Sequence, residues 1–269
     1  MTESLDGRML AEALRRLALR QTEIDGVMDR IVDDTIGLLL YGSRARGDFV
    51  PSSDFDLLRF TTAWDSPTFK SGRVSVSSYT PEQLLSANGT LFGTHIQRDG
   101  RVLIERNDEL TSLVAAFSPA EPDKLLERVR RYSMILNQPE AEMRSHCLGL
   151  VRLARYLLRT AIYAIAMAQG KPCFSVRELA AQYGEPRLAT LLASDPEITG
   201  PGSDALLEEL VSRLVVAIGP LPSHDHGSLH ALAVRYWDVD RSLAALAIRA
   251  ADEDDADSLD YSDLPKVLL

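Results

Sequence analysis

Cysteine is scarce in this sequence of 269 residues. The two cysteines, Cys147 and Cys173, are not in a Cys-x-x-Cys arrangement and stand in apolar, helix-forming segments. This usage is typical of buried thiols in a reducing compartment. We therefore do not expect a disulfide between them.

Long apolar runs are also missing. No segment approaches the ~18 consecutive apolar residues expected of a transmembrane helix. The N-terminal segment MTESLDGRMLAEALRR carries acids at Glu3 and Asp6 and has no continuous apolar core, so it lacks the layout of a secretory signal. We expect a cytoplasmic protein that does not bind membranes.

The chain has no excess of positive charge, because 39 acidic residues outnumber 29 Lys and Arg residues and give a formal net charge of −10. Nucleic acids are bound through Lys and Arg that displace counterions, so this balance argues against broad, sequence-independent binding to DNA or RNA. A local basic patch is still allowed. Hydrophobic residues make up 45% of the chain, which is enough for a folded core and excludes disorder of the whole protein.

The pattern of apolar residues changes near Ser118-Pro119. Before this point, short runs bounded by turn residues predict strands over 36–41, 55–60, 73–79 and 101–104, and helical periodicity predicts helices over 6–32 and 81–96. After it, only helices are predicted, over 121–136, 140–169, 176–183, 203–218 and 228–250. We therefore expect an α+β protein in which a mixed sheet with flanking helices (1–117) precedes an all-α helical bundle domain (118–250).

The two most polar segments are expected to be loops. Residues 194–202 are rich in Asp, Pro and Gly, which predicts a loop between helices. The last segment, 251–269, holds seven acids between Asp252 and Asp263 and predicts a solvated acidic tail. A functional alternative is that this tail competes with an anionic substrate for a basic site.

The segment LLLYGSRARGDFVPSSDFDLLRF combines an apolar strand, Gly-Ser, a turn, and Ser-Asp-x-Asp at the start of another strand. Side chains alternate along a strand, so Asp54 and Asp56 should project from one face about 6.6 Å apart along the chain. Two neighbouring carboxylates repel each other unless a cation lies between them, and their oxygens suit a hard cation such as Mg²⁺. The alternatives are a solvated turn, or the capping of a helix by Asp54.

Residues suited to phosphate binding lie just before these acids. Gly42 allows close approach of the backbone, and Ser43 offers an amide and a hydroxyl at the start of a helix. Arg44 and Arg46 are candidate clamps for a triphosphate, and Ser53 is a further candidate nucleotide-binding residue. The alternatives are an ordinary strand-to-helix turn and two surface arginines.

As a whole, GSRARGDFVPSSDFDLL resembles the Gly-Ser and Asp-x-Asp signature of the DNA polymerase beta-like nucleotidyltransferase superfamily, with Gly42, Ser43, Asp54 and Asp56 at the matching positions. The resemblance covers residues 30–105, and the fused helical half is similar to minimal nucleotidyltransferases and aminoglycoside adenylyltransferases. It implies a nucleotidyltransferase-type sheet and an Mg²⁺-dependent enzyme that moves a nucleoside monophosphate from a nucleoside triphosphate (NTP) to an acceptor hydroxyl. Pyrophosphate would leave through two-metal chemistry.

One part of the family pattern is missing. The resemblance implies a third carboxylate on the neighbouring strand, where Ser75 and Ser77 stand instead. Glu82, Glu105, Asp65 or a partner protein could supply it, and otherwise slow turnover is expected. The second hypothesis is a catalytically weak or inactive protein that binds an NTP or a protein partner, such as an antitoxin. For an enzyme, the acidic composition favours a small molecule or a protein as acceptor over a nucleic acid.

Three histidines near the C-terminus, His224, His226 and His230, admit a zinc site as one interpretation. No fourth ligand accompanies them, and they stand in a polar loop that enters a helix. A solvated cluster at the start of the helix is the preferred interpretation.

Overall fold

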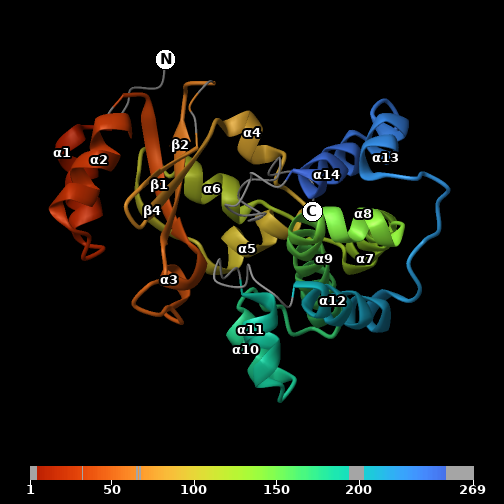
Figure 1. Cartoon of the computed structure of the whole chain (residues 1–269). Coiled ribbons are helices and arrows are strands. Elements are labelled where there is room, and N and C mark those ends of the chain that lie inside the picture. Colours follow the sequence, from red (N-terminus) through yellow and green to blue (C-terminus); the bar gives the residue numbers. More distant parts are fainter. Residues whose placement is uncertain (1–4, 32, 65, 67, 194–202, 253–269) are drawn as a thin grey trace. The chain divides into compact units, whose positions relative to one another are not determined.

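The structure is a computed structural model that describes residues 5–31, 33–64, 66, 68–193 and 203–252. It divides into two compact units, Met1–Ala120 and Glu121–Leu269. The first unit contains the sheet and the second is helical (Figure 1). Among the described residues, no helix combines the length and the apolar character needed to cross a membrane.

The first unit is built on a five-stranded mixed sheet with the order β3-β4-β2-β1-β5. Strand β2 runs parallel to β4, and the other neighbouring strands are antiparallel. The strands are β1 (Thr35–Tyr41), β2 (Phe55–Thr61), β3 (Phe69–Ser71), β4 (Val74–Tyr79) and β5 (Arg101–Glu105). Every residue of β1 is buried, as expected for a strand whose apolar run is continuous.

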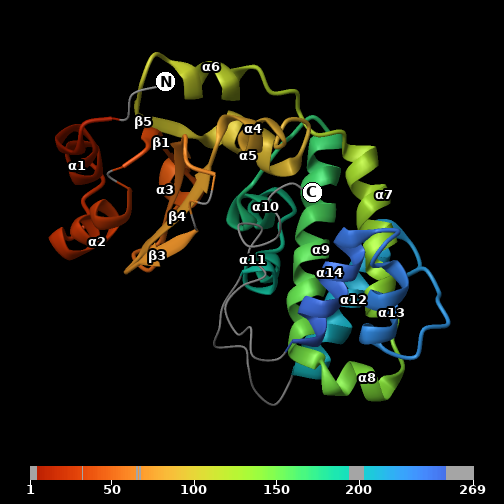
Figure 2. The same cartoon turned by 90° about the horizontal axis from the view of Figure 1, so that it is seen from above.

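Helices cover both faces of this sheet (Figures 1 and 2). One face packs against α1 (Gly7–Arg15) and α2 (Gln21–Ile31) through residues that include Leu38, Leu40, Leu57 and Val76. The other packs against α4 (Pro81–Leu85), α5 (Leu91–Asp99) and α6 (Glu109–Ala115) through residues that include Leu39, Tyr41, Leu58 and Phe60. Alternation along each strand therefore builds two separate cores.

The second unit consists of helices, of which the long α9 contacts α7, α11, α12 and α14. Most of the side chains of α9 are buried, which explains its nearly uniform apolar sequence. The helices are α7 (Pro122–Tyr132), followed by a 3₁₀ turn η1 (Ser133–Leu136), α8 (Glu140–Ser145), α9 (Cys147–Ala168), α10 (Val176–Gln182), α11 (Pro186–Leu192), α12 (Ser203–Ile218), α13 (Leu229–Tyr236) and α14 (Arg241–Ala251).

The expected α+β class, a mixed sheet with flanking helices followed by a helical region, is confirmed. Three predicted helices are wrong in their continuity, because 81–96, 140–169 and 228–250 are each divided in two. The short elements β3, α6 and α11 were not predicted. The predicted loop 194–202 lies outside the described residues, as does the acidic tail beyond Asp252.

Both cysteines are free thiols. Cys173 is buried, as predicted. The prediction for Cys147 is wrong, because this side chain is only half-buried at the start of α9. Partial burial raises the pKa of its thiol to about 11, so it remains protonated at neutral pH.

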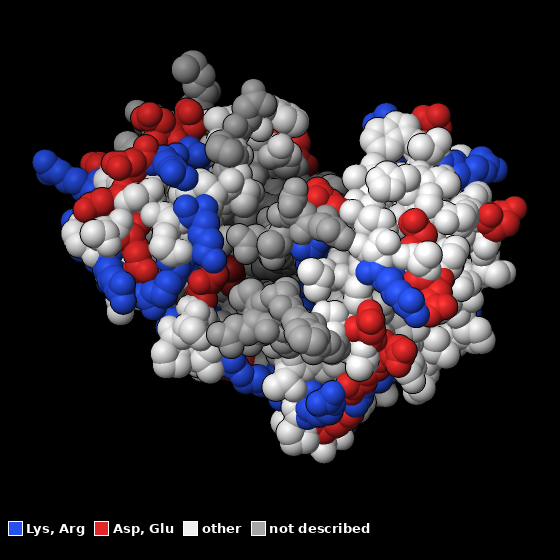
Figure 3. Space-filling view, viewed as in Figure 1, with Lys and Arg blue, Asp and Glu red and all other residues white. Residues whose placement is uncertain are grey.

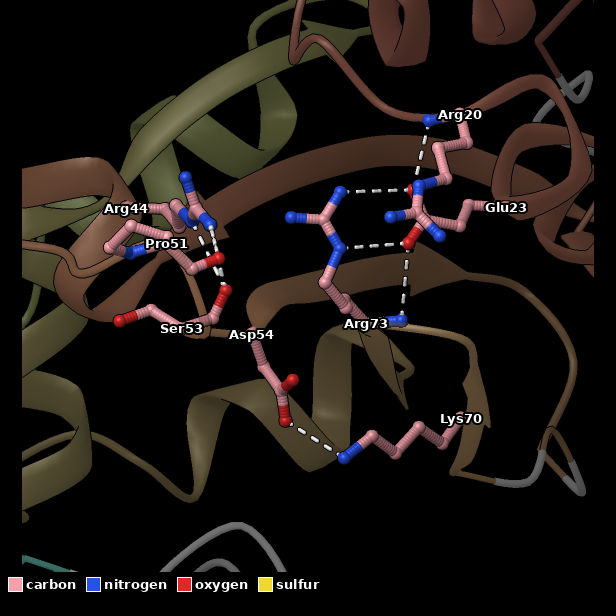
Figure 4. Close-up of polar contacts among 8 residues, drawn as sticks. All are labelled: Arg20, Glu23, Arg44, Pro51, Ser53, Asp54, Lys70 and Arg73. Carbon is pink, nitrogen blue, oxygen red and sulfur yellow. Dashed lines mark hydrogen bonds and ion pairs between the residues drawn. The ribbon is translucent and has the colours of Figure 1, made fainter.

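An ion pair holds α2 against the sheet. Glu23, on α2, is buried and accepts hydrogen bonds from Nε and Nη2 of Arg73 at 3.0 and 3.2 Å, and another from the backbone N–H of Arg20 (Figure 4). The hydrogen bonds from Arg73, the largest cause, lower the pKa of Glu23 from 4.5 to about 2 despite its burial.

We expect Glu23→Gln to lower the free energy of unfolding by ~2 kcal/mol at pH 7, because it removes the buried carboxylate of a partly buried pair. The matched control is Glu12→Gln, which breaks an exposed pair with Arg16 and should cost less than ~1 kcal/mol. Urea titration of both variants measures the difference. Equal losses in the two variants would contradict a special role for Glu23.

The same pair predicts how stability depends on pH. A carboxyl whose pKa is lowered in the folded state stabilises the protein fully above its ordinary pKa and loses this contribution as the group becomes protonated. For Glu23 the loss should occur as the pH falls from 4.5 to about 2. In this window the stability of the wild type should fall more steeply than that of Glu23→Gln.

Candidate nucleotide-binding site

Strand β1 ends where the Gly-Ser motif begins, directly beside the second aspartate. Tyr41, the last residue of β1, pairs with Asp56 on β2. Gly42 follows with φ +73°, a left-handed conformation that glycine adopts without strain. A Cβ atom at Gly42 would overlap Oδ2 of Asp56 and lie 3.3 Å from its Cγ. The predicted Gly42 and Asp56 are thus in contact, and the missing side chain of the glycine makes room for the carboxylate.

Ser43 lies in α3 (Gly42–Arg46), a single helical turn. The turn ends at Gly47, which has φ +87° and donates its N–H to the carbonyl of Ser43 at 2.9 Å. The structure therefore places Ser43 one residue from the Gly42–Asp56 contact.

Arg44 stabilises the loop between α3 and β2. Its guanidinium lies over the rings of Phe49 and Phe55, 4.1 and 4.4 Å from their centroids. It donates to the carbonyls of Ser53 and Pro51 at 2.9 and 3.2 Å (Figure 4). Phe55 packs on the α2 face of the sheet, opposite to the aspartates that alternate with it. Arg44 is placed here as part of the loop, and its role as a phosphate clamp stays a prediction.

Ser53 belongs to the same loop. Its hydroxyl accepts a hydrogen bond from the N–H of Val50 at 2.9 Å, and its carbonyl is bound by Arg44. These contacts fix the turn that leads into Asp54. Its predicted contact with a nucleotide is not tested by this geometry.

Arg46 is largely buried and joins α3 to α5. It lies 3.2 Å from Asp48 and 3.6 Å from Asp99, and its Nη1 is 3.1 Å from Nε2 of His95. Burial, together with the neighbouring Arg46, lowers the pKa of His95 to about 3, so its imidazole is neutral at pH 7. In this arrangement Arg46 anchors the Gly-Ser turn instead of reaching into solvent.

Asp54 lies just before β2 and is bound by a cation that the sequence did not predict. Oδ2 of Asp54 is 2.8 Å from Nζ of Lys70, on β3 (Figure 4). The side chains are 39% and 61% exposed, so this pair is open to solvent and to ligands. The lysine is distant in sequence, and its contact with Asp54 follows from the pairing of β3 with β4.

The strand that should carry a third carboxylate is β4, and its register is now defined. Asp56 pairs with Ser75, and Ser75 pairs in turn with Lys70. Paired residues project from the same face, so Asp56, Ser75 and Lys70 form a row across three strands. Ser77 pairs with Leu58 and is fully buried. Ser75 is therefore the position beside the aspartates, and Ser77 lies in the core.

The other acids considered for the third carboxylate do not lie beside Asp56. Glu105 pairs with Gly37, four residues along β1 from Tyr41, and its carboxylate accepts a hydrogen bond from the N–H of Thr111. Four residues of a strand span about 13 Å. Glu82 follows the distant end of β4. These two suggestions are wrong for this structure, and Asp65 lies outside the described residues.

The donors present limit which metal site could form. Among the described residues, no group of three or more His, Cys, Asp or Glu side chains could hold a metal ion. Asp54 and Asp56 offer hard carboxylate oxygens that fit one Mg²⁺, an ion that keeps several waters and takes further ligands from phosphates. The described residues offer no third carboxylate for the two-metal arrangement that the resemblance implies.

The three C-terminal histidines lie in a separate cluster in the helical unit. Nε2 of His224 is 3.1 Å from the carbonyl of Met134, and the rings of His224 and His226 stack with their centroids 5.5 Å apart. His230 instead contacts the ring of His146. These contacts are those of a polar loop packed on its helix.

Charges of both signs are interspersed over the first unit on the face shown in Figure 3. Among the described side chains on this face, no broad area is formed by Lys and Arg alone. This distribution gives no support to extensive phosphate-backbone binding there.

Comparisons with known proteins give little beyond this geometry. No family model matches the chain, and no curated protein matches it. Among solved structures, a nucleotidyltransferase-like protein from Exiguobacterium sibiricum 255-15 matches at 16% identity over 77% of this chain and 74% of that chain, with a TM-score of 0.30. A TM-score this low does not establish a shared fold, so the functional assignment depends on the residues of this chain.

Proposed function

We propose that this protein binds an NTP with one Mg²⁺ and transfers a nucleoside monophosphate to an acceptor hydroxyl. The contact between Gly42 and Asp56 carries this proposal. It joins the motif suited to phosphate with the motif suited to the cation, where β1 ends and β2 begins. An ordinary turn needs no glycine fitted around a carboxylate.

Each residue has a distinct part in the proposed chemistry. Asp54 and Asp56 would hold the divalent ion, and Gly42 and Ser43 would receive the phosphate oxygens. When bound, the ion would neutralise charge on the triphosphate and activate it for attack. The acceptor oxygen would form a bond to the α-phosphorus as the bond from that phosphorus to the pyrophosphate oxygen breaks, and the hydroxyl proton would pass to water or to a base on the acceptor or a partner.

Removal of that proton is expected to limit the rate of the reaction. Ser75, the residue beside Asp56, has no basic group at neutral pH. A missing general base typically lowers a rate by ~10² to 10⁴. We therefore expect slow transfer to an acceptor hydroxyl on a small molecule or a protein, unless a partner or the acceptor itself supplies a base.

The same observation favours a second candidate function. A site with Ser75 in place of a carboxylate, and with Lys70 already bound to Asp54, is suited to holding an NTP without using it. The protein would then act by binding a nucleotide or a protein partner, as an antitoxin does. Its nucleotide affinity would be retained and its turnover absent.

Two measurements distinguish these functions. Calorimetric titration with each of the four NTPs and Mg²⁺ reports binding, and release of pyrophosphate in the presence of a panel of acceptor alcohols and proteins reports transfer. Binding with pyrophosphate release supports the enzyme. Binding without release over the whole panel supports the second candidate, and no binding of any NTP would overturn both.

Asp54→Asn and Asp56→Asn should each weaken Mg²⁺-dependent NTP binding by ~100-fold or more, because even residues that only orient metal ligands contribute ~10–100-fold to metal affinity. The free energy of unfolding of Asp54→Asn should change by less than ~1 kcal/mol, since its pair with Lys70 is exposed. The control is Asp29→Asn, an exposed acid on α2, which should bind the NTP normally. Unfolding of either site variant would indicate a structural role instead.

A further inference from the structure

Lysine is rare in this chain, which has Lys70, Lys124, Lys171 and Lys266. Lys70 is the single lysine of residues 1–120, where every other basic side chain apart from histidine is an arginine. The two residue types differ chemically. Arginine is planar and bonds through a fixed fork, whereas lysine carries a compact, strongly hydrated point charge on a flexible stem. Of these two side chains, the ammonium of lysine therefore resembles a bound metal ion more closely in its charge and size.

Lys70 also lies where a metal ion bound by the aspartates would lie. Its partner in the strand register is Ser75, which pairs with Asp56. The lysine then reaches along the sheet to Asp54, 2.8 Å away. One cation thus lies on the same face of the sheet as both carboxylates that would hold Mg²⁺.

The neighbouring arginine does not take this role. Arg73 points away from Asp54, and its guanidinium is paired with Glu23 (Figure 4). The same guanidinium lies over the ring of Phe55. Phe55 packs on the α2 face of the sheet, opposite to the aspartates. The ammonium of Lys70 is the cation that directly contacts Asp54.

The balance of charge shows the consequence. Asp54, Asp56 and Lys70 together carry a formal charge of −1, compared with −2 for the two carboxylates alone. A divalent ion that binds Asp54 must displace the ammonium and is repelled by it at short range. In the nucleotide-free protein, the lysine and the metal ion therefore compete for the same carboxylate.

We propose that Lys70 is a built-in counter-ion that keeps divalent cations off the aspartate pair until a nucleotide arrives, and that its ammonium then turns to the triphosphate. The second half rests on the proposed function, since it requires an NTP. The first half concerns the nucleotide-free protein and is independent of it. The long stem of lysine allows both positions from one backbone site.

The test is a titration with Mn²⁺ in the absence of nucleotide, in which electron paramagnetic resonance measures the concentration of the free ion. Lys70→Gln should bind Mn²⁺ ~10-fold more tightly than the wild type, because one positive charge near the ion is removed. Lys70→Arg retains the charge and should remain within ~3-fold of the wild type. Lys124→Gln is the matched control, since Lys124 forms an exposed pair with Glu121 in the other unit, and it should leave the affinity unchanged.

Two further variants and a second titration complete the test. Adding Asp54→Asn to Lys70→Gln should abolish the gain, because the ion then lacks the carboxylate that the lysine released. With Mg²⁺ present, Lys70→Gln should bind the NTP ~10-fold more weakly, because the triphosphate loses its contact with the ammonium. Unchanged Mn²⁺ affinity in Lys70→Gln would overturn the counter-ion role, whereas failure of the wild type to bind any NTP would overturn the proposed function and leave the Mn²⁺ result standing.

Discussion

Gly42→Ala is expected to abolish Mg²⁺-dependent NTP binding while leaving the protein folded. The added methyl group would overlap Oδ2 of Asp56, and the carboxylate would have to rotate away from its place beside the Gly-Ser turn. A displacement of this kind would remove a proposed cation ligand and fill the space proposed for the phosphate. The backbone cost is modest, ~1–2 kcal/mol, because φ at Gly42 is +73°.

Gly47→Ala is the matched control for this experiment. Gly47 has φ +87°, so alanine meets the same kind of backbone strain, but no atom lies within 4 Å of the added Cβ. Both variants should therefore lose similar stability in thermal melts, and only Gly42→Ala should lose the nucleotide in calorimetric titration. Normal binding by Gly42→Ala would show that the contact with Asp56 is incidental to binding.

The residues of the central contact, although not the contact itself, could be predicted because they depend on local rules. Alternation along a strand places Asp54 and Asp56 on one face, and a glycine directly after a buried strand predicts an unusual backbone conformation. Both expectations need only a few residues of sequence. The register that brings Asp56 against Gly42 is then fixed by the antiparallel pairing of two adjacent strands.

The partners of the charged side chains could not be predicted in this way. Arg44 and Arg46 stand beside the Gly-Ser motif in the sequence, but in the structure they contact a loop and a distant helix. Lys70 meets Asp54 only because β3 folds back on β4. A three-residue strand is too short for its periodicity to be recognised in the sequence, so the contact of Lys70 with Asp54 could not be predicted.

The helix breaks were missed for a different reason. The predicted helix 81–96 runs through the polar segment Ser-Ala-Asn-Gly-Thr at 86–90, where Gly89 adopts φ +72° and Thr90 caps a new helix by accepting a hydrogen bond from the N–H of Gly93. Asn88-Gly89 is a turn signal that could have located this break. The division at His146 has no comparable signal, since neither glycine nor proline stands there.

The second prediction with a large effect concerns the missing carboxylate. Ser75→Asp should raise the rate of nucleotide transfer by ~10² to 10⁴, the usual contribution of a positioned general base. Ser75 is half-exposed, pairs with Asp56, and lies between Asp56 and Lys70 in the strand register. A carboxylate at this position would lie where the general base is expected, with the ammonium of Lys70 as a neighbouring cation. Pyrophosphate release under saturating NTP measures the gain.

Ser77→Asp separates this effect from a general effect of added negative charge. Ser77 lies on the same face two residues along β4, but it is fully buried beside Leu58, and its hydroxyl has no hydrogen-bond partner among the described residues. A carboxylate there would lack both water and a cation, so this variant should lose ~3 kcal/mol or more of stability and gain no activity. A gain in rate from Ser75→Asp alone supports a site that lacks only its base. If Ser75→Asp folds and binds the NTP but transfers no faster than the wild type, the missing carboxylate is not what limits the reaction, and the nucleotide-binding role without catalysis becomes the better account.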